Sequence, residues 1–244
     1  MTEIYSQFLI NHLSLVIQPI VDAQTHEVYF YEILSRVEFE GRTYLPNEFI
    51  PDMNIQARFR LAKHIFKRIC KLQEKYPEMS FSLNISSVEI DMGIEEFLAT
   101  ICESKTYQLD TSRCVIEITE HASIDNPSTY ESLKNIKNRF GFKFALDDFG
   151  SNFATLNKIY DAEDIFDYIK IDGTLVKDIE SNPVKQISLH HIIKLIQANG
   201  KKAIVEYISS EEVYRKVTET AKPDYLQGFF FGIPCKVDDY LAKK

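Results

Sequence analysis

Short apolar runs alternate with longer amphipathic stretches along most of this chain. The apolar runs have the length and composition of buried strands, and we predict strands at Leu15–Val21, Val28–Leu34, Phe81–Ile85, Val115–Thr119, Lys143–Asp147, Tyr168–Ile171, Lys202–Tyr207 and Tyr225–Phe231. The longer stretches predict helices at Ile55–Glu74, Ile94–Glu103, Ser128–Phe140, Pro183–Ala198 and Ser210–Thr220. No Gly-, Ser- or Pro-rich linker interrupts the pattern, which indicates one domain over residues 1–244.

The order of these elements predicts an α/β fold. Eight strands alternating with helices in 244 residues match a (β/α)₈ barrel. A doubly wound parallel sheet is the structural alternative, but no Gly-rich phosphate turn follows the first strand. Only residues 22–27 separate the first two strands, whereas a parallel crossover needs a dozen or more residues. We therefore predict a modified TIM (β/α)₈ barrel whose first strand is antiparallel and forms a hairpin with the second.

Nearly every predicted strand ends in a polar residue that core packing does not require. These residues are Glu32, Asn84, Glu117, the pair Asp147 and Asp148, Lys170, Glu206 and Gln227. The carboxyl ends of barrel strands converge on the face that holds the active site. The start of a helix would also explain adjacent Asp residues, but two such carboxylates raise each other's pKa unless a cation is held between them. Polar ends on seven strands together indicate a site.

The residue types at this face predict its chemistry. Carboxylates and an amide oxygen are preferred ligands of Mg²⁺ and Mn²⁺, so we expect one or two of these ions. No His or Cys lies among these positions, which argues against zinc. A two-metal site activates water and stabilises displacement at a phosphodiester. Lys170 would orient that water or offset negative charge, and Arg36 is placed to hold a phosphate.

Composition and charge narrow the class of partner and the compartment. A net charge of -8 disfavours a surface that coats a nucleic acid polymer. The four cysteines, Cys70, Cys102, Cys114 and Cys235, lack a C-x-x-C spacing, and we interpret them as buried thiols. The sequence shows neither a signal peptide nor an apolar run long enough to span a bilayer. We expect a cytoplasmic protein without membrane insertion.

The polar strand ends occur within strings that follow one another in a specific order. The strings are Gln18-Pro19-Ile20-Val21, Glu32-Ile33-Leu34-Ser35-Arg36, Asn84, Glu117-Ile118-Thr119-Glu120, Asp147-Asp148-Phe149-Gly150, Lys170-Ile171-Asp172 and Gln227-Gly228-Phe229. The ordered set resembles the EAL-domain family from about Leu15 to about Leu241. This resemblance implies a modified TIM barrel and a metal-dependent phosphodiesterase that opens the bacterial second messenger cyclic di-GMP to linear pGpG. It also implies a homodimer and a role in motility or biofilm control.

The resemblance also implies a role for each matching residue. Glu32, Asn84, Glu117 and Asp147 resemble the ligands of one metal, and Asp147, Asp148 and Glu206 resemble those of a second. Glu206, Lys170, Glu32 and Gln227 resemble the catalytic residues, with Glu206 the candidate general base. Gln18, Leu34, Arg36, Asp172 and Pro234 resemble substrate contacts. Glu120 resembles the glutamate that positions the loop 149–156, which couples to dimerisation in this family.

Several positions depart from the family pattern. Ile33 replaces Ala in the signature triplet, Asn152 replaces a Gly, Tyr207 replaces a Gly, Ser209 replaces a second Glu, and Ile233 replaces a basic residue. Tyr207 adds bulk at the pocket and Ser209 removes a charge near Glu206, and such changes around metal ligands reduce affinity or activity about 10–100-fold. The aromatic run 229–231 is most simply interpreted as barrel packing, although one of its rings could border the guanine pocket.

Two other functions stay open at this point. A catalytically silent EAL protein would bind cyclic di-GMP or a protein partner without turnover. Silent members usually lose metal ligands, whereas this chain keeps them, which favours catalysis. Another metal-dependent barrel hydrolase would not reproduce the whole motif order. We expect a stand-alone EAL protein, because the sequence shows no GGDEF-like or sensory segment. Its regulation would then come through expression, dimerisation, a regulatory protein partner or a missing part of a longer gene product.

Overall fold

The strands of the computed structural model form one sheet that closes into a barrel. The structure describes residues 8–104, 107, 109–119, 126–151 and 165–242. The strands are β1 (Leu13–Asp22), β2 (Val28–Phe39), β3 (Arg42–Tyr44), β4 (Phe81–Ile85), β5 (Cys114–Thr119), β6 (Lys143–Phe149), β7 (Tyr168–Ile171), β8 (Lys202–Val205) and β9 (Tyr225–Gln227). Their order is β1-β9-β8-β7-β6-β5-β4-β2-β3, and β1 also pairs with β2, so every strand except β3 belongs to the closed ring. The predicted α/β barrel is confirmed.

The first strand is the antiparallel member of the ring. β1 pairs antiparallel with both β2 and β9, while the other neighbouring pairs around the ring are parallel. A polar turn joins β1 to β2, because an Asp22 carboxylate oxygen accepts hydrogen bonds from the backbone N–H groups of Gln24 and Thr25, both at 2.9 Å. His26 completes the turn with a φ of 60°. The hairpin predicted from the short connection is therefore confirmed.

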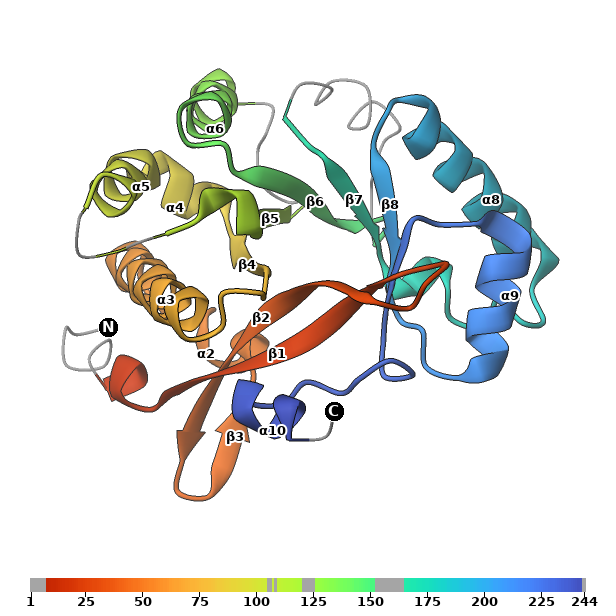
Figure 1. Ribbon diagram of the computed structural model, residues 1–244, viewed down its shortest axis with the longest axis horizontal. Helices are drawn as coiled ribbons and strands as arrows, with labels where there is room; N and C mark the ends of the chain where they lie inside the picture. Colours follow the sequence, from red (N-terminus) through yellow and green to blue (C-terminus); the bar gives the residue numbers. More distant parts are fainter. Residues whose placement is uncertain (1–7, 105–106, 108, 120–125, 152–164, 243–244) are drawn as a thin grey trace.

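Helices cover the outside of the barrel, with α3 to α6 on one side and α8 and α9 on the other (Figure 1). The helices are α2 (Pro46–Phe49), α3 (Ile55–Lys75), α4 (Ser87–Asp91), α5 (Ile94–Cys102), α6 (Pro127–Phe140), α8 (Pro183–Ala198), α9 (Glu211–Ala221) and α10 (Val237–Leu241), with short 3₁₀ turns η1 (Thr111–Arg113) and η2 (Gly173–Leu175). Polar caps start the four longest of the described helices, where the side chains of Asn54, Asn126, Asn182 and Ser210 accept backbone N–H groups of the first turn. All five predicted helices are confirmed, with small shifts at their ends.

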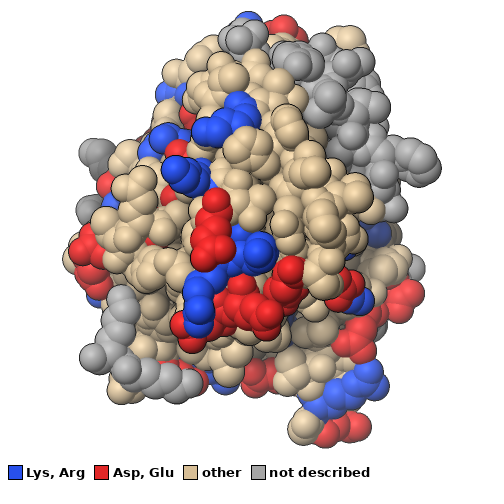
Figure 2. Space-filling view, turned by 90° about the vertical axis from the view of Figure 1, so that its right-hand side faces the viewer, with Lys and Arg blue, Asp and Glu red and all other residues tan. Residues whose placement is uncertain are grey.

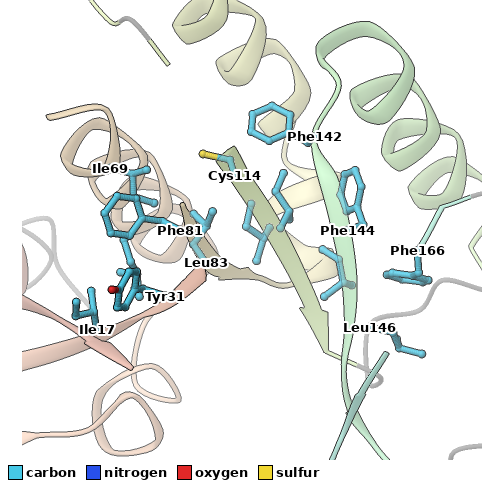
Figure 3. Packing of buried hydrophobic residues seen from close by; sticks show 14 of the residues in the cluster. Ile17, Tyr31, Ile69, Phe81, Leu83, Cys114, Phe142, Phe144, Leu146 and Phe166 are labelled. Carbon is cyan, nitrogen blue, oxygen red and sulfur yellow. The ribbon is translucent and has the colours of Figure 1, made fainter. Parts of the chain in front are cut away.

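Alternation along each strand separates two environments. Outward residues such as Phe81, Cys114 and Phe144 point toward the helices and form the main core (Figure 3). Inside the barrel, an apolar layer closes the end where the parallel strands begin, and its members are Ile20, Phe30, Val115, Ala145, Tyr168 and Ile204. Two residues after each residue of this apolar layer on a parallel strand, the chain places a polar residue, and these are Glu32, Glu117, Asp147, Lys170 and, just past the end of β8, Glu206. On the antiparallel β1 the corresponding polar residue, Gln18, comes two residues before Ile20. The apolar layer thus forms the floor beneath a polar layer.

Several strand ends differ from the prediction. β8 ends at Val205 and β9 at Gln227, earlier than expected, and the φ of 62° at Tyr207 is incompatible with a continued strand. Phe229 and Phe230 are 65% and 41% exposed, so interpreting them as barrel packing is wrong. β2 continues to Phe39 and pairs with β3, an extension that the sequence pattern did not predict.

The surface carries charges of both signs, and the four thiols differ in burial. Figure 2 shows basic and acidic side chains next to one another on the side of the molecule that carries α8 and α9. Cys70 and Cys114 are buried free thiols as expected, whereas Cys102 and Cys235 are partly exposed, so that interpretation was wrong for those two. Among the described residues, no helix combines the length and apolar character needed to cross a bilayer.

Candidate active site

The polar layer lies at the carboxyl ends of the parallel strands, where neighbouring strands place its members side by side. Strand register pairs Gln18 with Glu32 and Asn84 with Glu117. Glu32, Glu117, Asp147, Lys170 and Gln227 are all buried, with exposures of 6%, 0%, 7%, 1% and 4%. Since buried ionisable groups are rare unless they are paired, this layer is a candidate functional site.

Lys170 is the cation at the centre of this layer. Its Nζ lies 2.7 Å from Glu117 Oε2, 2.9 Å from Asp147 Oδ1, 2.9 Å from Glu206 Oε1 and 3.5 Å from Glu32 Oε2. Burial alone would lower the pKa of Lys170, but the surrounding carboxylates, Asp147 first, raise it well above its ordinary value. Lys170 therefore stays charged, and one ammonium faces four carboxyl groups.

Amide side chains hold Glu32 in position. Asn84 Nδ2 donates to Glu32 Oε1 at 2.9 Å, and Gln227 Nε2 donates to Glu32 Oε2 at 2.6 Å. Gln227 Nε2 also lies 3.3 Å from Gln18 Oε1, and Gln18 Nε2 donates to the carbonyl oxygen of Gly232 at 3.1 Å. This chain of donors fixes both oxygens of the Glu32 carboxylate.

A bulge in β6 brings the two adjacent aspartates to the same site. A regular strand would direct Asp147 and Asp148 to opposite faces of the sheet. The φ of Asp148 is 57°, and the register with β7 shifts between Leu146 and Phe149. As a result, carboxylate oxygens of Asp147, Asp148 and Glu206 lie within 4.8 Å of one another. No pattern in the sequence indicated this backbone conformation.

The donor set fits divalent metal ions. Among the described residues, two groups of carboxylates have oxygens within 4.8 Å of one another: Glu32 with Glu117 and Asp147, and Asp147 with Asp148 and Glu206. Asp147 belongs to both groups. Glu117 Oε1 is buried and accepts no hydrogen bond from the described residues, so it is an oxygen that a cation would satisfy. Carboxylate oxygens grouped in this way suit Mg²⁺ or Mn²⁺.

Three carboxyl groups of the cluster have raised pKa values in the metal-free protein. Burial is the main cause for each of them. The neighbouring Glu32 charge adds to the rise at Glu117, while Lys170 partly opposes it at Asp147 and Glu206. The pKa of Glu206 rises to about 8. Burial thus favours the protonated form of these three carboxyl groups, whereas a bound cation would favour their charged form.

We expect Mg²⁺ to raise the Tm of this protein more at about pH 8.5 than at about pH 6. A raised pKa means that the folded metal-free state keeps protons that the unfolded chain releases. Stability of that state therefore falls as the pH rises from the ordinary value of 4.5 for Glu toward about 8 for Glu206. Thermal unfolding in Mg²⁺ and in EDTA, at matched ionic strength, measures the difference at each pH. An equal shift at both pH values would contradict this account.

Two cavities flank the carboxylate cluster. The first, about 250 Å³, is lined by residues that include Leu34, Arg58, Asn84, Asp147 and Asp148. The second, about 290 Å³, is lined by Gln18, Glu32, Leu34, Glu206, Tyr207, Ser209, Gln227, Gly228 and Phe229. Leu34 borders both cavities, so they form two sides of one site. Arg58 was not predicted, because it lies within the α3 pattern. Phe229 belongs to the aromatic run for which a ring at the pocket was the alternative to packing, and its place in the cavity wall agrees with that alternative.

The predicted substrate contacts divide into two sets. Gln18 and Leu34 line the cavities. Arg36, Asp172 and Pro234 line neither of these two cavities. Arg36 Nη1 donates to the carbonyl oxygen of Ser35 at 2.8 Å, and Asp172 caps η2 by accepting the N–H of Thr174 at 2.8 Å. A role for these three residues in binding stays a prediction.

The predicted loop-positioning residue Glu120 lies outside the described residues, as does the loop from Asn152 onward.

Together, the closed barrel, its antiparallel first strand and the buried carboxylates define an α/β barrel protein with a site suited to divalent metal. The family model described as EAL domain matches residues 2–234, so this chain belongs to the EAL domain family.

Named relatives agree with this membership. The chain is 28% identical over 219 residues to the probable cyclic di-GMP phosphodiesterase PdeA of Escherichia coli K12, covering 85% of this chain and 29% of the relative. It is 25% identical over 242 residues to the cyclic di-GMP phosphodiesterase PdeF of the same organism, covering 95% and 31%. The chain thus spans about three-tenths of the length of these two relatives.

Solved structures agree on the fold. An EAL domain protein from Listeria monocytogenes EGD-e superimposes with a TM-score of 0.80 at 24% identity, covering 99% of this chain and 96% of that one. The EAL enzyme Bd1971, bound to cAMP and cyclic di-GMP, superimposes with a TM-score of 0.83 at 23% identity, covering 99% and 67%.

Proposed function

We propose that this chain is a metal-dependent phosphodiesterase that hydrolyses cyclic di-GMP to linear 5'-pGpG. The names of PdeA and PdeF support the substrate and the reaction class. The observation in this chain that carries the proposal is the pair of cavities joined at Leu34, with the buried carboxylates between them.

The shape of the site suits a ligand with two bases. Cyclic di-GMP carries two guanines on a ring that contains two phosphodiester groups. The first cavity reaches Asn84 and Asp148, and the second reaches Glu32 and Glu206. One base in each cavity would place a phosphodiester between them, next to the carboxylate cluster. A mononucleotide would occupy one cavity and leave the other to water.

The residues present would divide the chemistry among themselves. Glu32, Asn84, Glu117, Asp147, Asp148 and Glu206 would hold one or two Mg²⁺ or Mn²⁺ ions. Such ions polarise a phosphodiester and lower the pKa of a bound water. Glu206, with a pKa of about 8 in the metal-free protein, is suited to accept a proton as general base. Lys170 would hold the attacking water and offset charge that develops on the phosphate.

Purified protein with Mg²⁺ or Mn²⁺ is expected to convert cyclic di-GMP to pGpG, because the bound metal would activate water beside the phosphodiester. Separation of nucleotides by chromatography measures the product, and EDTA serves as the metal-free control. Tight binding without turnover would contradict the enzyme and support the silent EAL alternative. Absence of both binding and turnover would reject both functions.

We also propose that residues 1–244 form a single EAL-type domain that acts in the cytoplasm, where this second messenger would be met. The described strands support one domain because they all belong to one sheet. Assembly as a homodimer and contact with a regulatory protein follow from the family resemblance and are part of this proposal. Light scattering of the purified chain tests the dimer.

A further inference from the structure

Two large aromatic side chains are exposed at the second cavity. Tyr207 is 50% exposed and Phe229 is 65% exposed, and both line the cavity that contains Glu206. Neither ring has an aromatic partner among the described residues, whereas the adjacent Phe230 stacks on Tyr214 with centroids 5.6 Å apart. Exposed aromatic surface at the rim of a polar cavity marks a place where a ligand binds.

The position of Tyr207 is held by its backbone and by a close neighbour. Its φ of 62° is unfavourable for a residue with a side chain, and such strain persists where the surroundings enforce it. A Cβ at Gly173 would lie 2.8 Å from Tyr207 Cβ and 2.9 Å from its Cγ. Only glycine at position 173 leaves room for this ring. The ring therefore lies beside Gly173 at the rim, at the edge of the carboxylate cluster.

The two rings are carried by segments that are bonded to each other. Ile208 N–H donates to the carbonyl oxygen of Gln227 at 3.0 Å, and Phe230 N–H donates to the carbonyl oxygen of Ile208 at 2.9 Å. A Cβ at Gly228 would lie 2.2 Å from the backbone oxygen of Ile208, so the two segments are in contact there. The spacing between Tyr207 and Phe229 is thus set before a ligand arrives.

The chemistry of the cavity identifies the class of occupant. Its wall combines exposed aromatic rings with the amides of Gln18 and Gln227 and the carboxylates of Glu32 and Glu206. A flat ligand with an aromatic face and polar edges matches this combination, since faces stack on rings and edges hydrogen-bond to amides. An apolar protein segment would offer no donor to Gln227 Oε1, which is buried and accepts no hydrogen bond from the described residues. A nucleobase is the ligand that meets both requirements.

We propose that Tyr207 contacts the substrate and determines specificity, its ring stacking on one purine base in the second cavity with Phe229 as the neighbouring apolar wall. This inference rests on the function proposed above and assigns a base-binding role to the residue that replaces a family Gly. In this proposal the ring adds binding surface beside the carboxylate cluster and so improves substrate binding. The comparison with the family pattern led to the opposite expectation, that the bulk of Tyr207 reduces activity.

Kinetics of substitutions at position 207 test the stacking. Tyr207→Ala is expected to raise KM for cyclic di-GMP about 10-fold or more with little change in kcat, because stacking contributes to binding in both ground and transition states. Tyr207→Phe, which keeps the ring, should leave KM near that of the wild type. A higher kcat/KM for Tyr207→Ala would overturn the proposal, because it would mean that the ring obstructs the site.

Fluorescence supplies a readout that does not depend on turnover. The chain contains no Trp, so Tyr207→Trp introduces a unique indole at this rim. Titration of this variant with cyclic di-GMP in EDTA, and with 5'-GMP, is expected to quench the indole as a base stacks on it. Tyr29→Trp is the matched control, because Tyr29 is 41% exposed and lies at the opposite end of the barrel, beside Tyr225 at the start of β9.

The two tests separate this inference from the proposed function. If wild-type protein hydrolyses cyclic di-GMP but Tyr207→Ala keeps its KM and Tyr207→Trp is not quenched, the stacking role is wrong and the enzyme stands. If cyclic di-GMP is not hydrolysed but 5'-GMP quenches Tyr207→Trp and not Tyr29→Trp, the base site stands and the proposed reaction is wrong. Equal quenching of both Trp variants would overturn the base site.

Discussion

Replacing Glu32 with alanine is expected to lower kcat for cyclic di-GMP hydrolysis about 10³-fold or more while leaving the fold intact. Glu32 joins the two halves of the site, since it belongs to the carboxylate group with Glu117 and Asp147 and also lines the second cavity. Its removal would take a ligand from the metal site and leave the amide donors of Asn84 and Gln227 without their acceptor.

Glu38→Ala is the matched control for this variant. Glu38 lies on the same strand, but its carboxylate is about half exposed and pairs with Lys236 at 3.4 Å away from the cluster. Its loss should leave kcat unchanged. Circular dichroism and thermal unfolding of both variants establish that they fold. A folded Glu32→Ala protein with wild-type kcat would show that the reaction does not use this carboxylate cluster.

The barrel was predictable from the sequence because both faces of its strands carry buried apolar residues. Outward residues such as Phe81 and Phe144 meet helices, and inward residues such as Phe30 and Ala145 fill the floor, so the strands read as short apolar runs. The antiparallel first strand followed from chain length alone, because the connection after Asp22 is too short for a crossover.

The site was predictable as far as inward positions and strand ends determine it. Glu117 and Lys170 could be recognised as candidate site residues because charged side chains are rarely buried in a core. The geometry that joins Asp148 to Glu206 was not predictable, since it depends on a bulge and a positive φ at a residue that tolerates several conformations. The place of Phe229 stayed open between packing and the pocket for a related reason: an aromatic run has the same composition in a strand and in a loop beside a cavity.

Lys170→Met is expected to lower the Tm of the metal-free protein by on the order of 10 °C at about pH 8, and to remove most of the activity. Methionine has a similar length, so the main change is the loss of the ammonium that lies within 2.9 Å of Glu117, Asp147 and Glu206. Removing one partner of a buried ion pair leaves uncompensated charge, which costs about 3–5 kcal/mol. Differential scanning calorimetry in EDTA measures the loss.

The pH dependence distinguishes this electrostatic cause from a packing defect. The pKa values of Glu117, Asp147 and Glu206 are raised, that of Glu206 to about 8, so lowering the pH toward about 5 favours their neutral forms and weakens their attraction to the ammonium. The difference in Tm between wild type and Lys170→Met should therefore be small at about pH 5 and grow as the pH rises toward about 8. A packing defect would cost the same at both pH values.

Two further comparisons make the Lys170 result decisive. Lys202→Met removes an exposed lysine that pairs with the partly buried Asp224 at 2.8 Å. An ion pair at the surface contributes about 1 kcal/mol, so this control should lose much less stability than Lys170→Met. Mg²⁺ should restore part of the Tm of Lys170→Met, because it brings positive charge to the same carboxylates that lost the ammonium.

A Lys170→Met protein as stable as the wild type in EDTA at about pH 8 would mean that those carboxylates are already neutral. In that case Lys170 would contribute to the reaction and not to stability, and hydrogen bonds between protonated carboxyl groups would stabilise the metal-free cluster.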